Sequence, residues 1–285
     1  MVNRAAGTAV GPMVIAAVEQ HRPPGQRLLD DPLAAAVLPA TSRWVAELSR
    51  GPRVRDWLFR ASERAAPGIW GGIACRKRYI DDRFASALED GVDRVVVLGA
   101  GLDTRARRLT TPNGVRVFEV DLPVNVERQR ARLGVPGHIT PVPIDFERED
   151  LSAVLASHGY RHDRRCLFVW EGVTQYLTED GVRRTLDFLA GAAAGSRLVF
   201  THVLRDFLDG TDLHGAQALH RRFATGRPLW RFGLHPHRVG DFLDAYGWRE
   251  VEQVGADELE ARYVRATGRA VPISPLERTV LADKP

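Results

Sequence analysis

Short, mostly apolar runs recur along the chain from residue 95 onward, and they constrain its fold more than any other feature. The runs are residues 95–98, 115–120, 139–144, 166–170 and 198–203, and two weaker candidates near the end are 249–254 and 278–282. An apolar run without polar alternation is typical of a strand buried on both faces of a parallel sheet. Amphipathic segments separate the runs, the clearest lying between Thr178 and Gly191. Strands and helices that alternate at this spacing predict an α/β fold with a doubly wound sheet.

The first 90 residues contain no such run and show helical spacing instead. Apolar residues within 5–18 predict a short amphipathic helix, and a longer helix is expected from about Ile73 to Leu88. We interpret residues 1–90 as an N-terminal helical cap and residues 91–285 as the core. Within the core, residues 204–234 are rich in His, Gly, Arg and aromatic side chains. They predict an insertion over the carboxyl edge of the sheet, that is, a lid.

Composition narrows the class of protein. The 285 residues include only two Cys, Cys75 and Cys166, and no paired CxxC pattern, which excludes a disulfide scaffold and a zinc module. No apolar run is long enough to span a membrane. The net charge is +4, but acidic and basic side chains are interleaved, as in residues 147–150, so we expect a solvated surface rather than a nucleic-acid interface. These features predict a soluble cytoplasmic protein without a membrane partner.

The most informative local sequence is the turn Gly99-Ala100-Gly101, which joins the first predicted strand to a helix. Glycines allow a sharp backbone turn and the close approach of a ligand, and a helix N-terminus offers free N–H groups. In a doubly wound sheet this turn lies where nucleotide-like ligands bind. Thr104 stands where the dinucleotide fingerprint has its third glycine, which disfavours NAD or FAD without excluding them.

Carboxylates follow the next predicted strands. Either Asp121 or Glu119 could accept the hydroxyls of a ribose, and Asp145 beside the ring of Phe146 could bind an adenine. Glu171 would suit a cation such as a sulfonium or an ammonium. A ligand that needs these acids but no pyrophosphate seat is S-adenosylmethionine. A nicotinamide- or flavin-dependent oxidoreductase, and a non-catalytic binding protein, are the alternatives.

Ordered sequence blocks carry a family resemblance. They are Arg76–Asp82, Val95–Arg105, Phe118–Pro123, Val142–Glu147, Trp170–Leu177, Trp230–Gly233, Glu277-Arg278 and Asp30–Ala34. In these blocks the chain resembles the leucine carboxyl methyltransferase family, particularly its actinobacterial S-adenosylmethionine-dependent O-methyltransferases, some of which act in polyketide tailoring and secondary metabolism. The resemblance implies a class I methyltransferase fold, a Rossmann-like sheet of seven strands with the last antiparallel.

The same resemblance implies roles for individual residues. Arg76 would contact the methionyl carboxylate of S-adenosylmethionine, and Gly99, Ala100 and Gly101 would cradle the methionyl part. The remaining cofactor residues would be Asp121 for the ribose, Asp145 and Phe146 for the adenine, and Glu171 for the methionyl amino group. Phe146 departs from the family pattern, in which many relatives carry Leu.

The acceptor is expected to be a small molecule, with a carboxylate or a phenolic hydroxyl as the methylated group. A carboxylate is already nucleophilic, whereas a phenol needs a general base, for which His is suited near neutral pH. The acceptor-side candidates are His202, Tyr176, Tyr79 and Trp230, and none is identified as the catalytic residue. Methyl transfer from a sulfonium needs no metal, and none is predicted.

Overall fold

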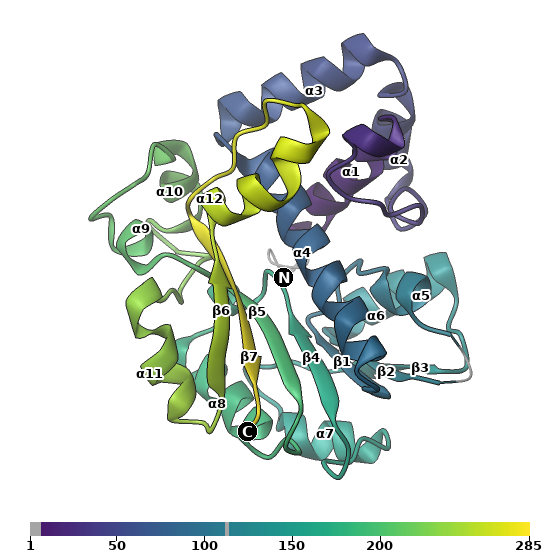
Figure 1. Ribbon diagram of the computed structural model, residues 1–285, viewed down its shortest axis with the longest axis vertical. Helices are drawn as coiled ribbons and strands as arrows, with labels where there is room; N and C mark the ends of the chain where they lie inside the picture. The colour runs from purple at the N-terminus through teal and green to yellow at the C-terminus, as the bar shows by residue number, and fades with distance from the viewer. Residues whose placement is uncertain (1–6, 112–113) are drawn as a thin grey trace.

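The computed structural model describes residues 7–111 and 114–285. Within them the chain forms a seven-stranded sheet (Figure 1). The strands are β1 (Arg94–Leu98), β2 (Arg116–Asp121), β3 (Ile139–Pro143), β4 (Cys166–Trp170), β5 (Arg197–Val203), β6 (Arg249–Val254) and β7 (Glu277–Asp283). Their order is β3-β2-β1-β4-β5-β7-β6, and β7 runs antiparallel to both of its neighbours. The predicted α/β sheet with an antiparallel last strand is confirmed.

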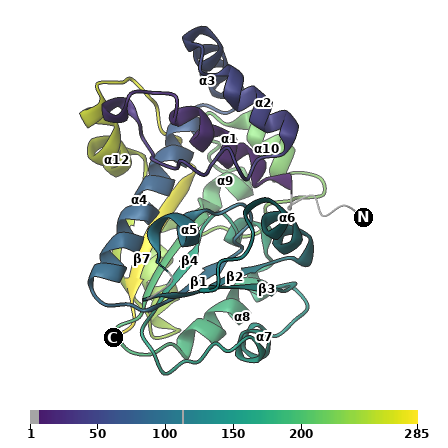
Figure 2. The same cartoon turned by 90° about the vertical axis from the view of Figure 1, so that its right-hand side faces the viewer.

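Helices cover both faces of the sheet (Figures 1 and 2). They are α1 (Val10–Glu19), α2 (Ala40–Leu48), α3 (Pro52–Ala65), α4 (Ile69–Glu89), α5 (Arg105–Leu109), α6 (Pro123–Leu133), α7 (Leu151–Ser157), α8 (Glu179–Ala190), α9 (Arg205–Asp209), α10 (Gln217–Phe223), α11 (Val239–Asp244) and α12 (Ala256–Leu259). Alternate residues of β1 enter different cores. Val95 and Val97 pack with α1, α4 and α12, whereas Val96 and Leu98 pack with α7, α8 and α11. This division explains why β1 shows no polar alternation.

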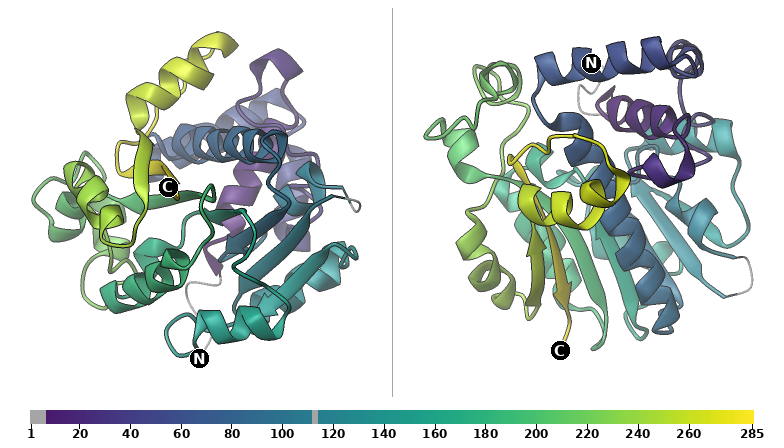
Figure 3. Two further views of the ribbon diagram at one scale, coloured as in Figure 1. Left: turned by 60° about the horizontal axis from the view of Figure 1, so that its bottom comes forward. Right: turned by 45° about the horizontal axis from the view of Figure 1, so that its top comes forward.

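The carboxyl edge of the parallel strands faces α1, α2 and α3, as the right-hand view of Figure 3 shows. Residues 1–6 of the expected cap, and residues 112–113 of the expected core, lie outside the described residues. Residues 204–234 form α9 and α10 and an isolated bridge between Leu204 and Leu234. Nowhere in the described part of the chain is a helix both long and apolar enough to cross a membrane.

The order of the strands reverses between β1 and β4, which are neighbours in the sheet. In an open α/β sheet such a switch point leaves a crevice at the carboxyl ends of the strands, because the connections leave in opposite directions. Gly99 directly follows β1 and Glu171 directly follows β4. The fold therefore brings two of the predicted site residues to this crevice.

Candidate active site

Two cavities open at this crevice. The first, of about 360 Å³, contains Trp230 in its wall, and we call it the Trp230 cavity. The second, of about 320 Å³, is called the Asp121 cavity. Gly99, Glu171 and Tyr176 line both. Because the two cavities share these residues, a ligand longer than either one can extend across the sheet edge at Gly99.

The Asp121 cavity contains the predicted acids of β2 and β3. Asp121 accepts hydrogen bonds from the backbone N–H of Gly101, from that of Leu122 at 2.6 Å and from the side-chain amide of Asn125 at 2.8 Å. Burial raises the pKa of Asp121, and these three hydrogen bonds partly oppose the rise. A carboxylate has about four lone-pair sites, so the aspartate retains the capacity to accept a further hydrogen bond.

Glu119, the alternative acid on β2, faces elsewhere. Its Oε1 accepts hydrogen bonds from Arg107 at 2.7 Å and from Gln129 at 3.3 Å, and the residue lines neither cavity. Burial raises the pKa of Glu119 to about 7 despite the nearby Arg107. Of the two acids that the sequence left open, Asp121 is the one at the site.

Asp145 and Phe146 also line the Asp121 cavity, two and three residues beyond the end of β3. Asp145 accepts a hydrogen bond from the backbone N–H of Glu147 at 3.1 Å, which shapes the turn. Phe146 is buried in the core that contains α7 and α8. A carboxylate and a fixed ring therefore stand together in the wall, as the sequence predicts.

The glycine turn is closed by local contacts. Gly99 has φ +73° and Gly101 has φ +53°. A Cβ at Gly99 would lie 2.3 Å from a methyl group of Val173, so the glycine leaves room for that side chain. Gly101 lines neither cavity, because its N–H is directed at Asp121. Gly99 nevertheless lines both cavities, whereas Gly101 contributes through its hydrogen bond to Asp121.

The helix after the turn also differs from the expectation. It is only five residues long, and the backbone N–H of Arg105 donates to Asp103 at 2.6 Å instead of being free. Thr104, at the position of the missing third glycine, donates its hydroxyl to the buried Asp31 at 2.7 Å. The threonine thus fastens the N-terminal region to the turn, which gives this departure from the dinucleotide fingerprint a structural reason.

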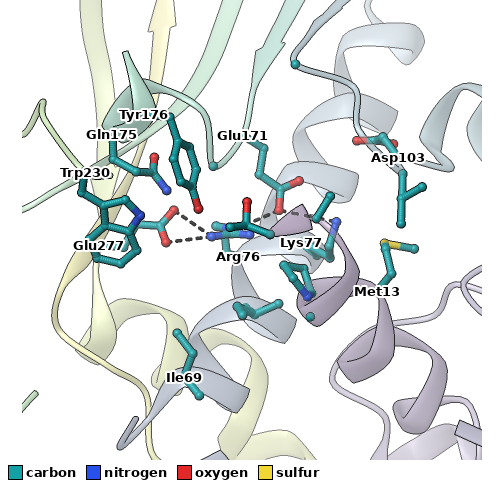
Figure 4. A pocket seen from close by; sticks show the side chains of 18 of the residues that line it. Met13, Ile69, Arg76, Lys77, Asp103, Glu171, Gln175, Tyr176, Trp230 and Glu277 are labelled. Atoms are coloured by element: carbon teal, nitrogen blue, oxygen red, sulfur yellow. Dashed lines mark hydrogen bonds and ion pairs between the residues drawn. The ribbon is translucent and has the colours of Figure 1, made fainter. Parts of the chain in front are cut away.

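Glu171 lies within a buried cluster of charges (Figure 4). Arg76 contacts its Oε1 at 2.8 Å, Arg105 contacts its Oε2 at 2.6 Å, and the amine of Lys77 lies 3.5 Å from Oε1. Burial disfavours the ionised carboxylate, but the three cations more than offset that effect and hold the pKa of Glu171 well below its usual range. Glu171 is therefore a carboxylate at neutral pH.

Arg76 and Arg105 extend this cluster to other elements. Nη1 of Arg76 donates to both carboxylate oxygens of Glu277, at 2.9 and 2.7 Å, and so connects α4 to β7. The fully buried Arg105 contacts Asp103 and also Asp81 of α4, the latter at 2.6 Å. The two arginines tie the long helix to the ends of β1, β4 and β7.

Apolar side chains from distant segments complete the Trp230 cavity. They include Ile69 and Ile73 of α4, and Leu219 and Phe223 of α10. Figure 4 shows Tyr176 pointing into this cavity toward Arg76. The cavity thus combines a charged end beside Glu171 with an apolar and aromatic end beside Trp230.

The sequence matches the family model described as leucine carboxyl methyltransferase over residues 9–190. A Frankia alni protein named as a candidate S-adenosyl-L-methionine-dependent methyltransferase is 33% identical over 252 residues, which cover 85% of this chain and 82% of the relative. A Streptomyces avermitilis protein with the same description is 34% identical over 267 residues, covering 90% and 87% of the two chains. The chain belongs to the leucine carboxyl methyltransferase family.

Solved structures agree on the fold. The crystal structure of a candidate methyltransferase from Thermobifida fusca has a TM-score of 0.57 at 17% identity and covers 100% of this chain and 98% of the other. A family member with this sheet has the class I methyltransferase fold, and it is an enzyme of the S-adenosylmethionine-dependent methyltransferase class. Family membership thus favours the methyltransferase over the oxidoreductase and the non-catalytic binding protein.

Two of the acceptor-side candidates do not reach the site of this methyltransferase. His202 is fully buried in β5, where its ring nitrogens contact the carbonyl of Val203 at 3.1 Å and the side chain of Gln253 at 3.4 Å. Burial lowers the pKa of His202 to about 4. Tyr79 is also buried and donates its hydroxyl to Glu252 at 2.7 Å. Both side chains lie outside the two cavities, because their positions on β5 and α4 point them into the packed interior.

The other predicted residues line the cavities, except Gly101, whose N–H donates to Asp121 behind the cavity wall. Those in the Trp230 cavity are Arg76, Gly99, Ala100, Glu171, Tyr176 and Trp230, and those in the Asp121 cavity are Asp121, Asp145, Phe146 and again Gly99, Glu171 and Tyr176. Sequence reasoning missed Lys77, Arg105, Gln175 and Glu277. All four fall within the family-like blocks, so membership of a block was the signal that could have marked them.

Proposed function

We propose that this methyltransferase transfers the methyl group of S-adenosylmethionine to an oxygen atom of a small molecule, such as a secondary metabolite. The observation that carries the proposal is the pair of adjoining cavities, one acidic with a fixed ring and one apolar beyond the Glu171 cluster. The adenosine part would occupy the Asp121 cavity, the methionyl part would lie at Gly99 and Glu171, and the acceptor would enter the Trp230 cavity.

The side chains present suit the donor molecule. Asp121 would accept hydrogen bonds from the ribose hydroxyls, and Asp145 would accept one from the adenine amino group beside Phe146. Glu171, held as a carboxylate, would attract the methionyl ammonium, and Arg76 would attract the methionyl carboxylate. Arg76 also contacts Glu277, so the guanidinium is already oriented toward this end of the cavity.

For methyl transfer the protein would mainly have to position the acceptor oxygen relative to the donor methyl group. The sulfonium supplies an activated methyl group, and an oxygen of the acceptor displaces the sulfur in line with the breaking bond. Alignment and exclusion of water would therefore provide most of the rate enhancement. We assign the exclusion of water to the N-terminal helices as a cap and to residues 204–234 as a lid, because both contribute walls to the cavities.

The assignment of Asp121 can be tested by calorimetry with S-adenosylhomocysteine. Asp121→Asn should weaken binding by about 10-fold, the effect of losing a charged hydrogen bond. Glu119→Gln is the matched control, since Glu119 is on the same strand but faces Arg107. Its affinity should stay within about 2-fold of the wild type. Equal losses in both variants, or no binding by the wild type at millimolar ligand, would contradict the proposal.

The class of acceptor oxygen has a chemical test. Radiolabelled methyl groups transferred to a carboxylate form an ester, which alkali hydrolyses to volatile methanol. Methyl groups transferred to a hydroxyl form an ether that survives the same treatment. The test needs only the enzyme, a labelled donor and candidate acceptors, and it separates the two oxygen classes that the family resemblance leaves open.

A further inference from the structure

Two buried polar atoms in the wall of the Trp230 cavity lack hydrogen-bond partners. Among the residues that the structure describes, neither the side-chain oxygen of Gln175 nor the indole nitrogen of Trp230 has one. Gln175 is only 5% exposed. Both residues line the cavity, and Figure 4 shows their side chains on the same side of it. An unpartnered buried polar group destabilises the protein, so a ligand that bonds both atoms would gain from the contact.

Neighbouring contacts hold both side chains in place. The hydroxyl of Thr174 donates to the carbonyl of Thr201 at 2.7 Å, which anchors the turn before Gln175 to β5. The backbone N–H of Arg231 donates to the carbonyl of Gln175 at 2.7 Å. Trp230 stacks on Phe223 with ring centroids 4.8 Å apart and an interplanar angle of 11°. The backbone of Gln175 is thus hydrogen-bonded to the residue that follows Trp230, which keeps the two side chains in the same wall.

The chemistry of these atoms selects a ligand group. An indole N–H only donates a hydrogen bond, whereas the oxygen of Gln175 only accepts one. A neutral hydroxyl satisfies both, because it accepts from Trp230 and donates to Gln175. Figure 4 places the carboxylate of Glu277 between Trp230 and Arg76. A carboxylate ligand at this point would face Glu277 and would have no proton to offer Gln175.

The surroundings select the rest of the molecule. Leu219, Phe223 and Ile69 line this end of the cavity, and a narrow apolar extension of about 40 Å³ continues between Val203 and Leu276. Aromatic and aliphatic walls of this kind favour a ring over a flexible polar chain, since burial of apolar surface supplies the binding free energy.

We propose that Gln175 and Trp230 form the acceptor subsite and that they bind a neutral hydroxyl on an apolar, ring-containing acceptor. The hydroxyl accepts a hydrogen bond from the indole N–H of Trp230 and donates one to the amide oxygen of Gln175. This inference rests on the proposed function, because it takes the rest of the Trp230 cavity to hold the methionyl part of the donor.

The test measures binding of three naphthalene probes by calorimetry, with S-adenosylhomocysteine saturating. The probes are 2-naphthol, 2-methoxynaphthalene, which can accept but not donate a hydrogen bond, and 2-naphthoate. The wild type should bind 2-naphthol about 5-fold more tightly than the methoxy probe and more tightly than the carboxylate, which corresponds to one hydrogen bond.

The variants separate the two partners. Gln175→Leu should remove the preference for 2-naphthol over 2-methoxynaphthalene, whereas Trp230→Phe should weaken both probes by about 5-fold and keep the preference. Trp57→Phe is the matched control, because Trp57 is 58% exposed on α3 and lines neither cavity. Affinity for S-adenosylhomocysteine should stay within about 2-fold in all three variants.

Three results would overturn the subsite. They are tighter binding of 2-naphthoate than of 2-naphthol, wild-type affinity for 2-naphthol in both site variants, and no binding of 2-naphthol to the saturated wild type. Failure of the proposed function gives a different result, because the wild type would then not bind S-adenosylhomocysteine at all.

Discussion

The two sides of the candidate active site are built differently. We call Gly99, Asp121, Asp145 and Glu171 the floor, since each lies at or just beyond the carboxyl end of a parallel strand. We call the wall formed by residues 69–77 and 219–230 the roof. Floor residues are placed by the register of neighbouring strands, whereas roof residues reach the site through packing between distant segments. The floor thus follows from local sequence, and the roof requires the whole fold.

Buried side chains join the floor to the roof. Arg105 contacts Asp81 of α4 and Glu171 of the floor, and Thr104 donates its hydroxyl to Asp31. These contacts fix the distance between α4 and the strand ends, on which the shape of the Trp230 cavity depends. We call these contacts between floor and roof the junction. Substitutions at the junction, in the floor and in the core below the floor test the difference between the two sides.

The largest effect is expected at the junction. Arg105→Met should lower the free energy of unfolding by about 3–5 kcal/mol, because it leaves Asp81, Asp103 and Glu171 buried without their shared cation. Urea denaturation measures the loss. The control is Arg78→Met, because Arg78 is exposed and pairs with the half-buried Asp82, and its expected cost is below about 1 kcal/mol. Similar losses in the two variants would show that the junction is not a special point of stability.

The floor is tested next. Gly99→Ala should cost about 2–4 kcal/mol, since an alanine at φ +73° is strained and its methyl group would overlap Val173. In the double variant with Val173→Ala the overlap is removed, and about half of the loss should return in thermal unfolding. If Val173→Ala gives no recovery, the glycine is required by backbone conformation alone.

His202, beneath the floor, should control stability with pH but not methyl transfer. Its pKa is lowered from 6.5 to about 4, so between these values the unfolded chain takes up a proton that the folded chain refuses. Stability is therefore lost as the pH falls from 6.5 toward 4, by about 2 kcal/mol at pH 5. His202→Asn should lack this part of the loss when unfolding is compared at pH 7 and pH 5. A large fall in S-adenosylhomocysteine affinity in this variant would place His202 at the site after all.

The sheet was largely predictable from the sequence because its strands are buried on both faces. Residues 166–170 form β4 with the expected bounds, since a uniform apolar run leaves one interpretation. Pro141 and Pro143 do not exclude β3, because that strand lies at the edge of the sheet. The floor followed directly, since the predicted strand ends located Gly99, Asp145 and Glu171, and only the choice between Asp121 and Glu119 needed the structure.

Long-range packing explains what the sequence did not predict. Helix α4 begins at Ile69 and not near Ile73. The sequence pattern suggested a later start because glycine disfavours helices, but Gly71 lies inside the helix, where it allows another segment to approach closely. A Cβ there would lie 2.3 Å from the carbonyl oxygen of Pro272. His202 occupies the end of a strand, as a catalytic base would, yet its side chain points into the interior. The sequence around His202 does not indicate the direction of its side chain, and the sequence around Gly71 does not indicate that residues 271–273 pack against it.

The position of β7 has a consequence for biosynthesis. The strand inserts between β5 and β6 and carries Glu277, whose carboxylate accepts hydrogen bonds from Arg76, 201 residues earlier in the sequence. Residues 277–283 leave the ribosome after α4 and the five parallel strands β1 to β5, so a nascent chain can hold those elements before Glu277 is available to Arg76. The ion pairs of Arg76 with Glu171 and Glu277, and the wall of the Trp230 cavity that they build, would then be complete only once β7 has joined the sheet.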